Sequence, residues 1–149
     1  MLKVSAASSG RYLGSENKAL PPQLQARPRL EVHAGDVLIT RASGVANLVG
    51  VSAYVEKTQE KLLLCDKLFR AVFRPKSPIE ARFMAIALRL NSVRSQIFRE
   101  FSTDSGMMKN VSKPVLLSLT FPLPPPSIQR RIRHDSDCGG KDRPAGLWH

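Results

Sequence analysis

Short apolar runs separated by turn-forming residues dominate the first half of the chain. A β-branched run over residues 37–41 follows the pair Gly35-Asp36, and apolar character resumes over residues 49–55 after small residues at 42–47. β-branched residues favour strands, and Gly-Asp pairs favour turns. The pattern predicts a strand–loop–strand unit. Further apolar runs, at residues 2–6, 62–64 and 68–73, predict that this half is mainly β.

The middle of the chain has a helical period instead. Ser77, Pro78 and Glu80 are the residue types preferred at the N-cap, first and third positions of a helix. Apolar residues then recur every three or four positions, as on one helix face: Ile79, Phe83, Ile86, Leu90, Val93, Ile97 and Phe101. We therefore expect one long amphipathic helix over about residues 78–101, ended by the polar stretch at 102–106.

The last third begins with a second polar loop at residues 106–112. Ser112 can cap a single helical turn, and residues 117–123 are apolar enough for an edge strand. Prolines end that strand, and residues 127–132 can begin a new helix. Residues 133–149 lack an apolar period and are expected to form a disordered tail.

The whole pattern indicates an α+β fold with one domain. A chain of 149 residues, of which 42% are hydrophobic, has the usual size and composition of a single domain with its own core. We expect a mainly β domain over residues 1–132, with the tail at 133–149 outside it.

Charge is the first property that indicates a partner. The net charge is +11, from 23 basic and 12 acidic residues. In one stretch the single acid Glu80 stands among the cations Lys67, Arg70, Arg74, Lys76, Arg82, Arg89, Arg94 and Arg99. Such an excess favours nucleic acid as the partner. Charge alone leaves open whether that partner is duplex DNA or structured RNA such as ribosomal RNA.

The sequence indicates no membrane partner. No apolar run is long enough to cross a bilayer, and the N-terminus lacks the apolar segment of a secretory leader. The two cysteines, Cys65 in an apolar run and Cys138 in a Gly-rich stretch, do not form a disulfide framework pattern. We therefore expect a cytoplasmic protein.

Motifs for catalysis, cofactors and metals are missing from the sequence. Neither phosphate-binding glycine pattern occurs, no serine stands in a nucleophile elbow, and the carboxylates are dispersed. A zinc site needs converging ligands, whereas His33, His134 and His149 are far apart. Residues 121–124 lack the amide with which a base methyltransferase binds its flipped base. We expect a non-catalytic protein without cofactor or metal.

The order of several motifs resembles the target-recognition domain of type I restriction-modification specificity subunits. They are Leu2-Lys3-Val4-Ser5, Gly35-Asp36-Val37-Leu38-Ile39-Thr40-Arg41, Leu48-Val49-Gly50, the helix at 83–101, Gly106-Met107-Met108-Lys109-Asn110-Val111-Ser112, and Phe121-Pro122-Leu123-Pro124-Pro125 followed by Gln129 and Ile132. Each motif is common by itself, and their order makes the resemblance specific. It covers residues 1–132, about nine-tenths of a domain-sized chain.

The resemblance implies a mostly β domain that lies against double-stranded DNA and reads half of a split target in the major groove. It also implies that separate methylation and restriction subunits carry out the chemistry. Loops can present donors to base edges while a sheet holds their register. The candidate DNA-binding residues are Arg41, Ser43 and Asn47 in the first polar loop, and Lys109 and Asn110 in the second.

Each candidate has an expected role and a structural alternative. Arg suits guanine, Asn suits adenine and Lys suits a phosphate. The alternatives are a solvated strand end at Arg41 and turn-stabilising side chains at Ser43, Asn47 and Asn110. Further candidates for phosphate contact are Arg70, Arg82 and Arg89.

Assembly is left open by the resemblance. A whole specificity subunit has two such domains separated by long helices that hold the methylation subunits, so we expect a chain truncated at both ends of one domain, without that spacer helix. Two other functions remain as alternatives. One is a general RNA- or ribosome-associated basic protein, and the other is a remnant that binds the methylation subunit without reading DNA.

Overall fold

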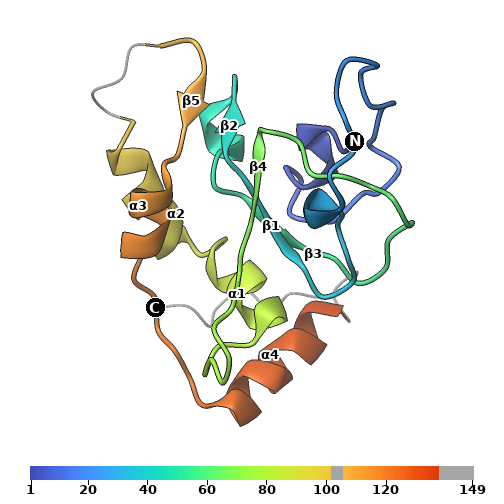
Figure 1. Cartoon of the computed structure of the whole chain (residues 1–149). Coiled ribbons are helices and arrows are strands. Elements are labelled where there is room, and N and C mark those ends of the chain that lie inside the picture. The colour runs from blue at the N-terminus through green and yellow to red at the C-terminus, as the bar shows by residue number, and fades with distance from the viewer. Residues whose placement is uncertain (102–105, 138–149) are drawn as a thin grey trace.

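A strand buried on both faces organises the fold. The computed structural model describes residues 1–101 and 106–137. In it, β1 (Val37–Thr40) is the middle strand of an antiparallel sheet between β3 (Ser52–Tyr54) and β4 (Leu68–Arg70) (Figure 1). All four residues of β1 are buried. The strand–loop–strand prediction for this region is thereby confirmed.

Short elements surround this sheet. They are the 3-10 helices η1 (Val4–Ala6), η2 (Pro28–Leu30) and η3 (Ala46–Leu48), the strands β2 (Ala42–Ser43) and β5 (Lys109–Asn110), and the helices α1 (Ala81–Ala87), α2 (Asn91–Arg99), α3 (Lys113–Ser118) and α4 (Pro126–Asp137). The α+β prediction is confirmed. The mainly β expectation is wrong for the described residues, because the strands have two to four residues and the α-helices six to twelve.

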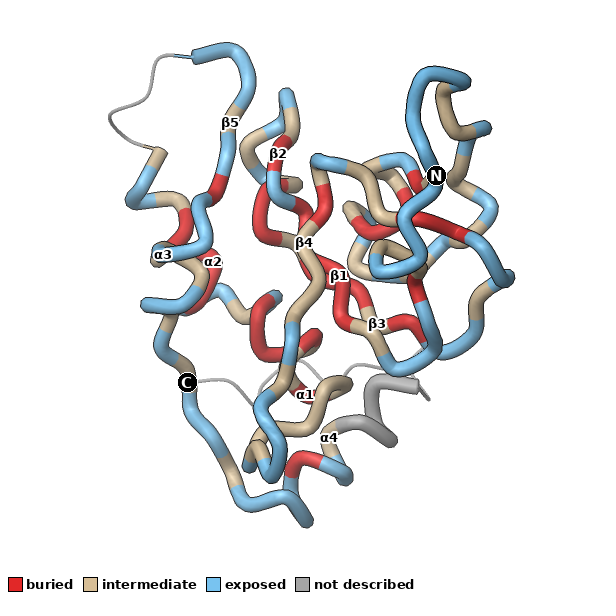
Figure 2. The backbone as a smooth tube through the Cα atoms, in the orientation of Figure 1, coloured by how far each residue is buried: buried red, intermediate tan, exposed pale blue. Residues whose placement is uncertain are grey.

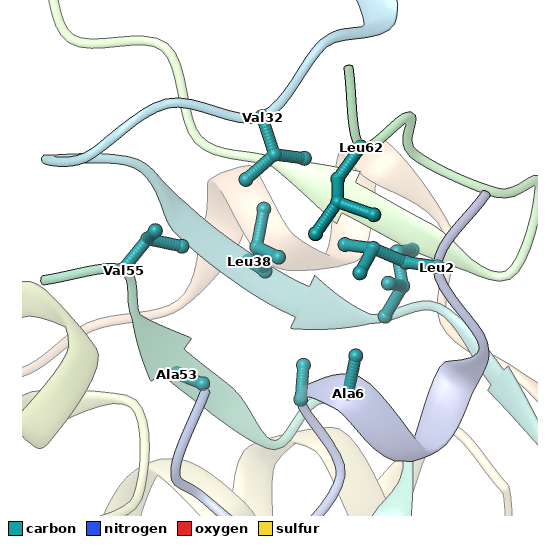
Figure 3. Packing of buried hydrophobic residues seen from close by; sticks show 9 residues of the cluster. Leu2, Ala6, Val32, Leu38, Ala53, Val55 and Leu62 are labelled. Carbon is teal, nitrogen blue, oxygen red and sulfur yellow. The ribbon is translucent and has the colours of Figure 1, made fainter. Parts of the chain in front are cut away.

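Neighbouring residues of β1 belong to two different cores, because successive side chains of a strand point to opposite faces. Leu38 lies in one core cluster together with residues of the N-terminal segment. The other members of this cluster include Leu2, Ala6, Val32, Ala53, Val55 and Leu62 (Figure 3). Val37 and Ile39 lie in the other cluster, with Ala85, Leu88 and Val93 from the region of α1 and α2. Figure 2 shows buried positions gathered along β1 and at α1. A hydrogen bond from the buried Ser52 Oγ to the Ala85 carbonyl, 2.7 Å long, also ties β3 to α1.

The N-terminal apolar run is not a strand. Leu2 makes one isolated bridge, with Asn17, and its N–H donates to the Leu63 carbonyl at 2.8 Å. The next residues form η1. Because Leu2 is fully buried, its apolar character reflects its place in the core and not an extended backbone.

The single long helix is also wrong. Helix α1 ends at Ala87 and α2 begins at Asn91, and Leu90 between them has an extended backbone with φ −62° and ψ 140°. Leu88, just after α1, and Val93 on α2 both pack in the cluster of the sheet. Ile97, four residues further along α2, packs with Val49 and Val111 outside the three-stranded sheet. The apolar stripe of the sequence is therefore interrupted at Leu90, and its last part contacts a second cluster.

In the last third, one expectation is confirmed and another is wrong. Ser112 caps α3, because its Oγ accepts a hydrogen bond from the Val115 N–H at 3.4 Å. The strand expected at 117–123 is wrong, because α3 continues to Ser118. Val115, Leu116 and Leu119 pack against a core cluster while Leu117 is 87% exposed, and this spacing of inward-facing residues is helical.

The helix expected at residues 127–132 is confirmed as α4, which continues to Asp137. The first residues of the expected disordered tail are thus helical. Residues 138–149, the rest of that tail, lie outside the described residues.

The cap expected at Ser77 is not formed. Ser77 Oγ accepts from the Ile79 N–H at 3.3 Å within a turn, and α1 begins only at Ala81 with Glu80 as its N-cap. The Glu80 side chain makes no capping hydrogen bond. The chain before α1 is held by a residue distant in sequence.

That residue is Gln129 on α4, whose side chain is 1% exposed. Its Oε1 accepts from the Glu80 N–H at 2.8 Å, and its Nε2 donates to the carbonyls of Pro78 at 2.9 Å and Pro124 at 2.8 Å. All polar atoms of the buried amide are therefore paired, and they join the chain before α4 to the chain before α1.

We predict that Gln129→Met lowers the free energy of unfolding by about 1–3 kcal/mol, because buried partners of the amide lose their hydrogen bonds. Urea denaturation measures this change. Ser127→Ala, at an exposed position of the same helix, should change stability by less than about 0.5 kcal/mol. Equal midpoints for Gln129→Met and the parent chain would contradict the role of Gln129 as a tertiary support.

Candidate nucleic-acid interface

The two polar segments found in the sequence meet in a two-stranded antiparallel ribbon. β2 and β5 place Ala42 opposite Asn110 and Ser43 opposite Lys109. Figure 1 shows this ribbon at the opposite end of the molecule from α4. A two-stranded ribbon is one of the elements that fit into the major groove of DNA. The structure thus brings four residues of the ribbon together, three of them predicted site residues.

The base of the ribbon is anchored in a small core. Val111, which follows β5, is buried against Val49 and Ile97, and its N–H donates to the Arg41 carbonyl at 2.9 Å. Asn110, one residue earlier, is exposed. The ribbon therefore has a fixed base while it carries polar side chains at the surface.

The loop after β2 contains Asn47, the last predicted site residue of the first polar segment. Ser43 Oγ accepts from the Val45 N–H at 3.1 Å, which is the turn-stabilising contact expected as its alternative role. Asn47 lies in η3 and is exposed. The Asn110 amide has a long 3.4 Å contact to the Met108 carbonyl. Asn47 and Asn110 thus leave most of their hydrogen-bonding capacity outside the contacts described within the protein.

A buried arginine, which sequence reasoning did not single out, holds this loop. Arg94 on α2 is 9% exposed, and its two terminal nitrogens donate to the carbonyls of Val49 at 2.6 Å and Asn47 at 2.8 Å. Its guanidinium also lies 4.9 Å from the ring centroid of Phe98. Burial lowers the pKa of Arg94 from its ordinary value. The sequence did contain a signal, because Arg94 stands four residues after Leu90 and three before Ile97, on the apolar stripe.

A glycine lets the loop approach α2 closely. Gly50 has φ +76°, and a Cβ added there would lie 2.5 Å from Ile97 Cδ1 and 3.0 Å from an Arg94 nitrogen. Both the left-handed backbone and the short distances require glycine. Gly44, in the same loop, has open space around its Cα and no such backbone.

Two cations lie near one aromatic ring beside the ribbon. The Arg41 guanidinium is 5.4 Å and the Lys113 ammonium 5.8 Å from the ring centroid of Phe69. Arg41 also donates to the Asp66 carbonyl at 3.2 Å, although it is exposed. Lys113 was not among the predicted site residues, and no motif marked it. The ring fixes positive charge close to the ribbon.

The three candidates for phosphate contact make contacts within the protein. Arg70 pairs with Asp36 at 3.2 Å and donates to two backbone carbonyls, and Arg82 pairs with Glu56. Arg89 donates to the Gly10 and Ala85 carbonyls, and burial lowers its pKa. None of these contacts joins the three arginines to β2 or β5. Their contact with phosphate stays a prediction, and their described contacts are structural.

Among residues 1–101 and 106–137, no group of three or more His, Cys, Asp or Glu side chains could hold a metal ion. No helix in this part of the chain is long and apolar enough to cross a membrane. Burial raises the pKa of the Cys65 thiol, which therefore stays protonated at neutral pH and is a poor nucleophile.

We predict that Gly50→Ala destabilises the chain by about 2–4 kcal/mol, because it adds backbone strain and a clash with α2. Gly44→Ala should change the free energy of unfolding by less than about 0.5 kcal/mol. Thermal or urea unfolding of the two variants checks the comparison. Similar stabilities of both variants would show that the loop does not approach α2 as described.

Comparison with known proteins shows what the sequence resembles. No protein-family model matches the chain. It is 37% identical over 132 residues to the type I restriction enzyme EcoEI specificity subunit of Escherichia coli. The match covers 89% of this chain and 22% of that protein, so the chain spans about a fifth of the relative's length. The resemblance inferred from the motif order is confirmed, because the chain is similar in sequence to part of a type I restriction enzyme specificity subunit.

Proposed function

We propose that the chain recognises the base sequence of double-stranded DNA, as a target-recognition domain of a type I restriction-modification system. The observation that carries this proposal is the ribbon of β2 and β5, which joins both polar segments at one surface. The similarity to a restriction enzyme specificity subunit supports it. So does the net charge of +11, because duplex DNA is a polyanion.

Within this proposal, the ribbon enters the major groove. Asn47 and Asn110 are exposed and suit adenine, whose edge offers one acceptor and one donor to an amide. Lys109 suits a phosphate. Arg41 and Lys113, which the Phe69 ring holds beside the ribbon, supply further positive charge to the backbone of the duplex.

The proposal assigns chemistry to other proteins. We infer that methyl transfer and cleavage belong to separate methylation and restriction subunits and that this chain acts without catalysis or cofactor. The partners are therefore double-stranded DNA and those subunits. Co-purification with a methylation subunit tests the second partner independently of DNA binding.

Selection from a library of random duplexes, followed by affinity measurement across a salt series, tests the DNA-reading role. The folded chain should enrich one short sequence and bind it about a thousandfold or more tighter than random duplex. Loss of all sequence preference in the folded chain would contradict the proposal. Tighter binding to structured RNA than to any duplex would favour the general RNA-binding alternative.

Two variants should separate positioning from reading. Lys109→Ala should weaken binding to all duplexes and reduce the salt slope by about one, because one phosphate contact is lost. Asn110→Ala should cost about 1–3 kcal/mol of discrimination at one base pair and leave the salt slope unchanged. Arg131→Ala, an exposed charge on α4, is the control and should change neither quantity. If Arg131→Ala alters the slope as Lys109→Ala does, the ribbon is not the contact surface.

A further inference from the structure

We propose that Arg94 is a positioning residue for sequence reading, one that determines specificity without touching DNA. This inference rests on the proposed function, because it names what sets the geometry of the reading loop. Its basis is the pair of hydrogen bonds from one buried guanidinium to the carbonyls of Asn47 and Val49, on either side of Leu48. One planar group thus holds the backbone at two points, one in η3 and one at the residue that follows η3.

The guanidinium is itself held in one orientation. The Phe98 ring centroid lies 4.9 Å from it, and α2, which carries both residues, packs through Val93 and Ile97 into the core. The planar fork of arginine is pre-organised, so little rotamer freedom is lost per hydrogen bond formed. The position of α2 therefore sets the orientation of the guanidinium, and the guanidinium in turn sets the position of the Asn47 backbone.

Hydrogen bonds within the loop give it a local shape. Ser43 Oγ accepts from the Val45 N–H, the N–H groups of Leu48 and Val49 donate to the carbonyls of Val45 and Ala46, and the Gly50 N–H donates to the Thr40 carbonyl at 2.7 Å. Val49 also packs against Ile97, and Arg94 supplies the side-chain hydrogen bonds described from α2 to this loop. Asn47 is exposed, so its side chain reaches a base edge correctly only if its backbone is fixed.

Burying a guanidinium costs free energy that an apolar residue of similar size would not cost. An arginine at this position of the stripe is therefore better explained by the geometry it imposes than by core packing. Without it, the carbonyls of Asn47 and Val49 would lose their hydrogen bonds to α2, and the position of Asn47 would be set less precisely. Phosphate contacts, which depend on charge at the surface, would remain, and discrimination between sequences would fall.

The experiment compares Arg94→Met and Arg94→Lys with Gln129→Met. Gln129 is the matched control because its buried side chain also donates to two backbone carbonyls, but it lies on α4, at the opposite end of the molecule from the ribbon (Figure 1). Affinities for the selected duplex and for random duplex are measured across a salt series. The temperature is chosen so that thermal unfolding shows every variant to be folded.

Arg94→Met should lose about tenfold or more in the ratio of specific to random affinity, which is the scale of one misread base pair. Its salt slope should be unchanged, because no phosphate contact is lost. Arg94→Lys keeps the charge but not the fork, so a several-fold loss is expected, and this variant carries the test if Arg94→Met does not fold. Gln129→Met should keep the ratio.

Each other outcome overturns the inference in a recognisable way. Full selectivity in both folded Arg94 variants would show that the loop needs no such support. An equal loss of selectivity in Gln129→Met would show a general effect of destabilisation. A reduced salt slope in Arg94→Met would mean a phosphate contact instead of positioning. A parent chain without sequence preference would overturn the proposed function and this inference together, whereas a selective parent chain confines the failure to Arg94.

Discussion

Burial of β1 on both faces is the constraint on which the candidate interface depends. A slip of one residue would exchange Leu38 with Val37 or Ile39 across the two cores, so the register of this strand is strongly fixed. The chain continues through Arg41 directly into β2 and changes its pairing partner there from β3 and β4 to β5. The position of the ribbon is therefore set by β1, the most buried strand in the described structure.

The helix α2 provides the second support. Ile97 contacts Val49 and Val111, which follow the two halves of the proposed interface, and Arg94 holds the loop carbonyls beside them. The extended backbone at Leu90 changes the direction of the chain between the two helices. Within α2, Val93 packs in the cluster of the sheet and Ile97 in the cluster beside the ribbon.

Local signals in the sequence predicted some elements correctly and others wrongly. The β-branched run became β1, and Ser112 caps α3 as expected. Features that depend on distant residues were not predictable. The N–H of Glu80 donates to the side chain of Gln129, 49 positions away. This tertiary contact takes the place of the cap that the sequence predicts at Ser77. The pairing of Ser43 with Lys109 likewise could not be read from either polar segment, although both segments were predicted as sites.

The site residues differ in how far the fold already uses them, and this difference orders their proposed roles. The Arg41 carbonyl accepts a hydrogen bond from the Val111 N–H, and its guanidinium donates to the Asp66 carbonyl and lies near the Phe69 ring. Arg41 therefore contributes partly to holding the fold together. Asn47 is held only through its backbone. A side chain that contributes little to folding can be exchanged at small cost in stability, whereas its backbone stays where the frame puts it. Within the proposed function, a change of base preference is therefore expected at Asn47 and Asn110 while β1, Arg94 and Gly50 remain the same.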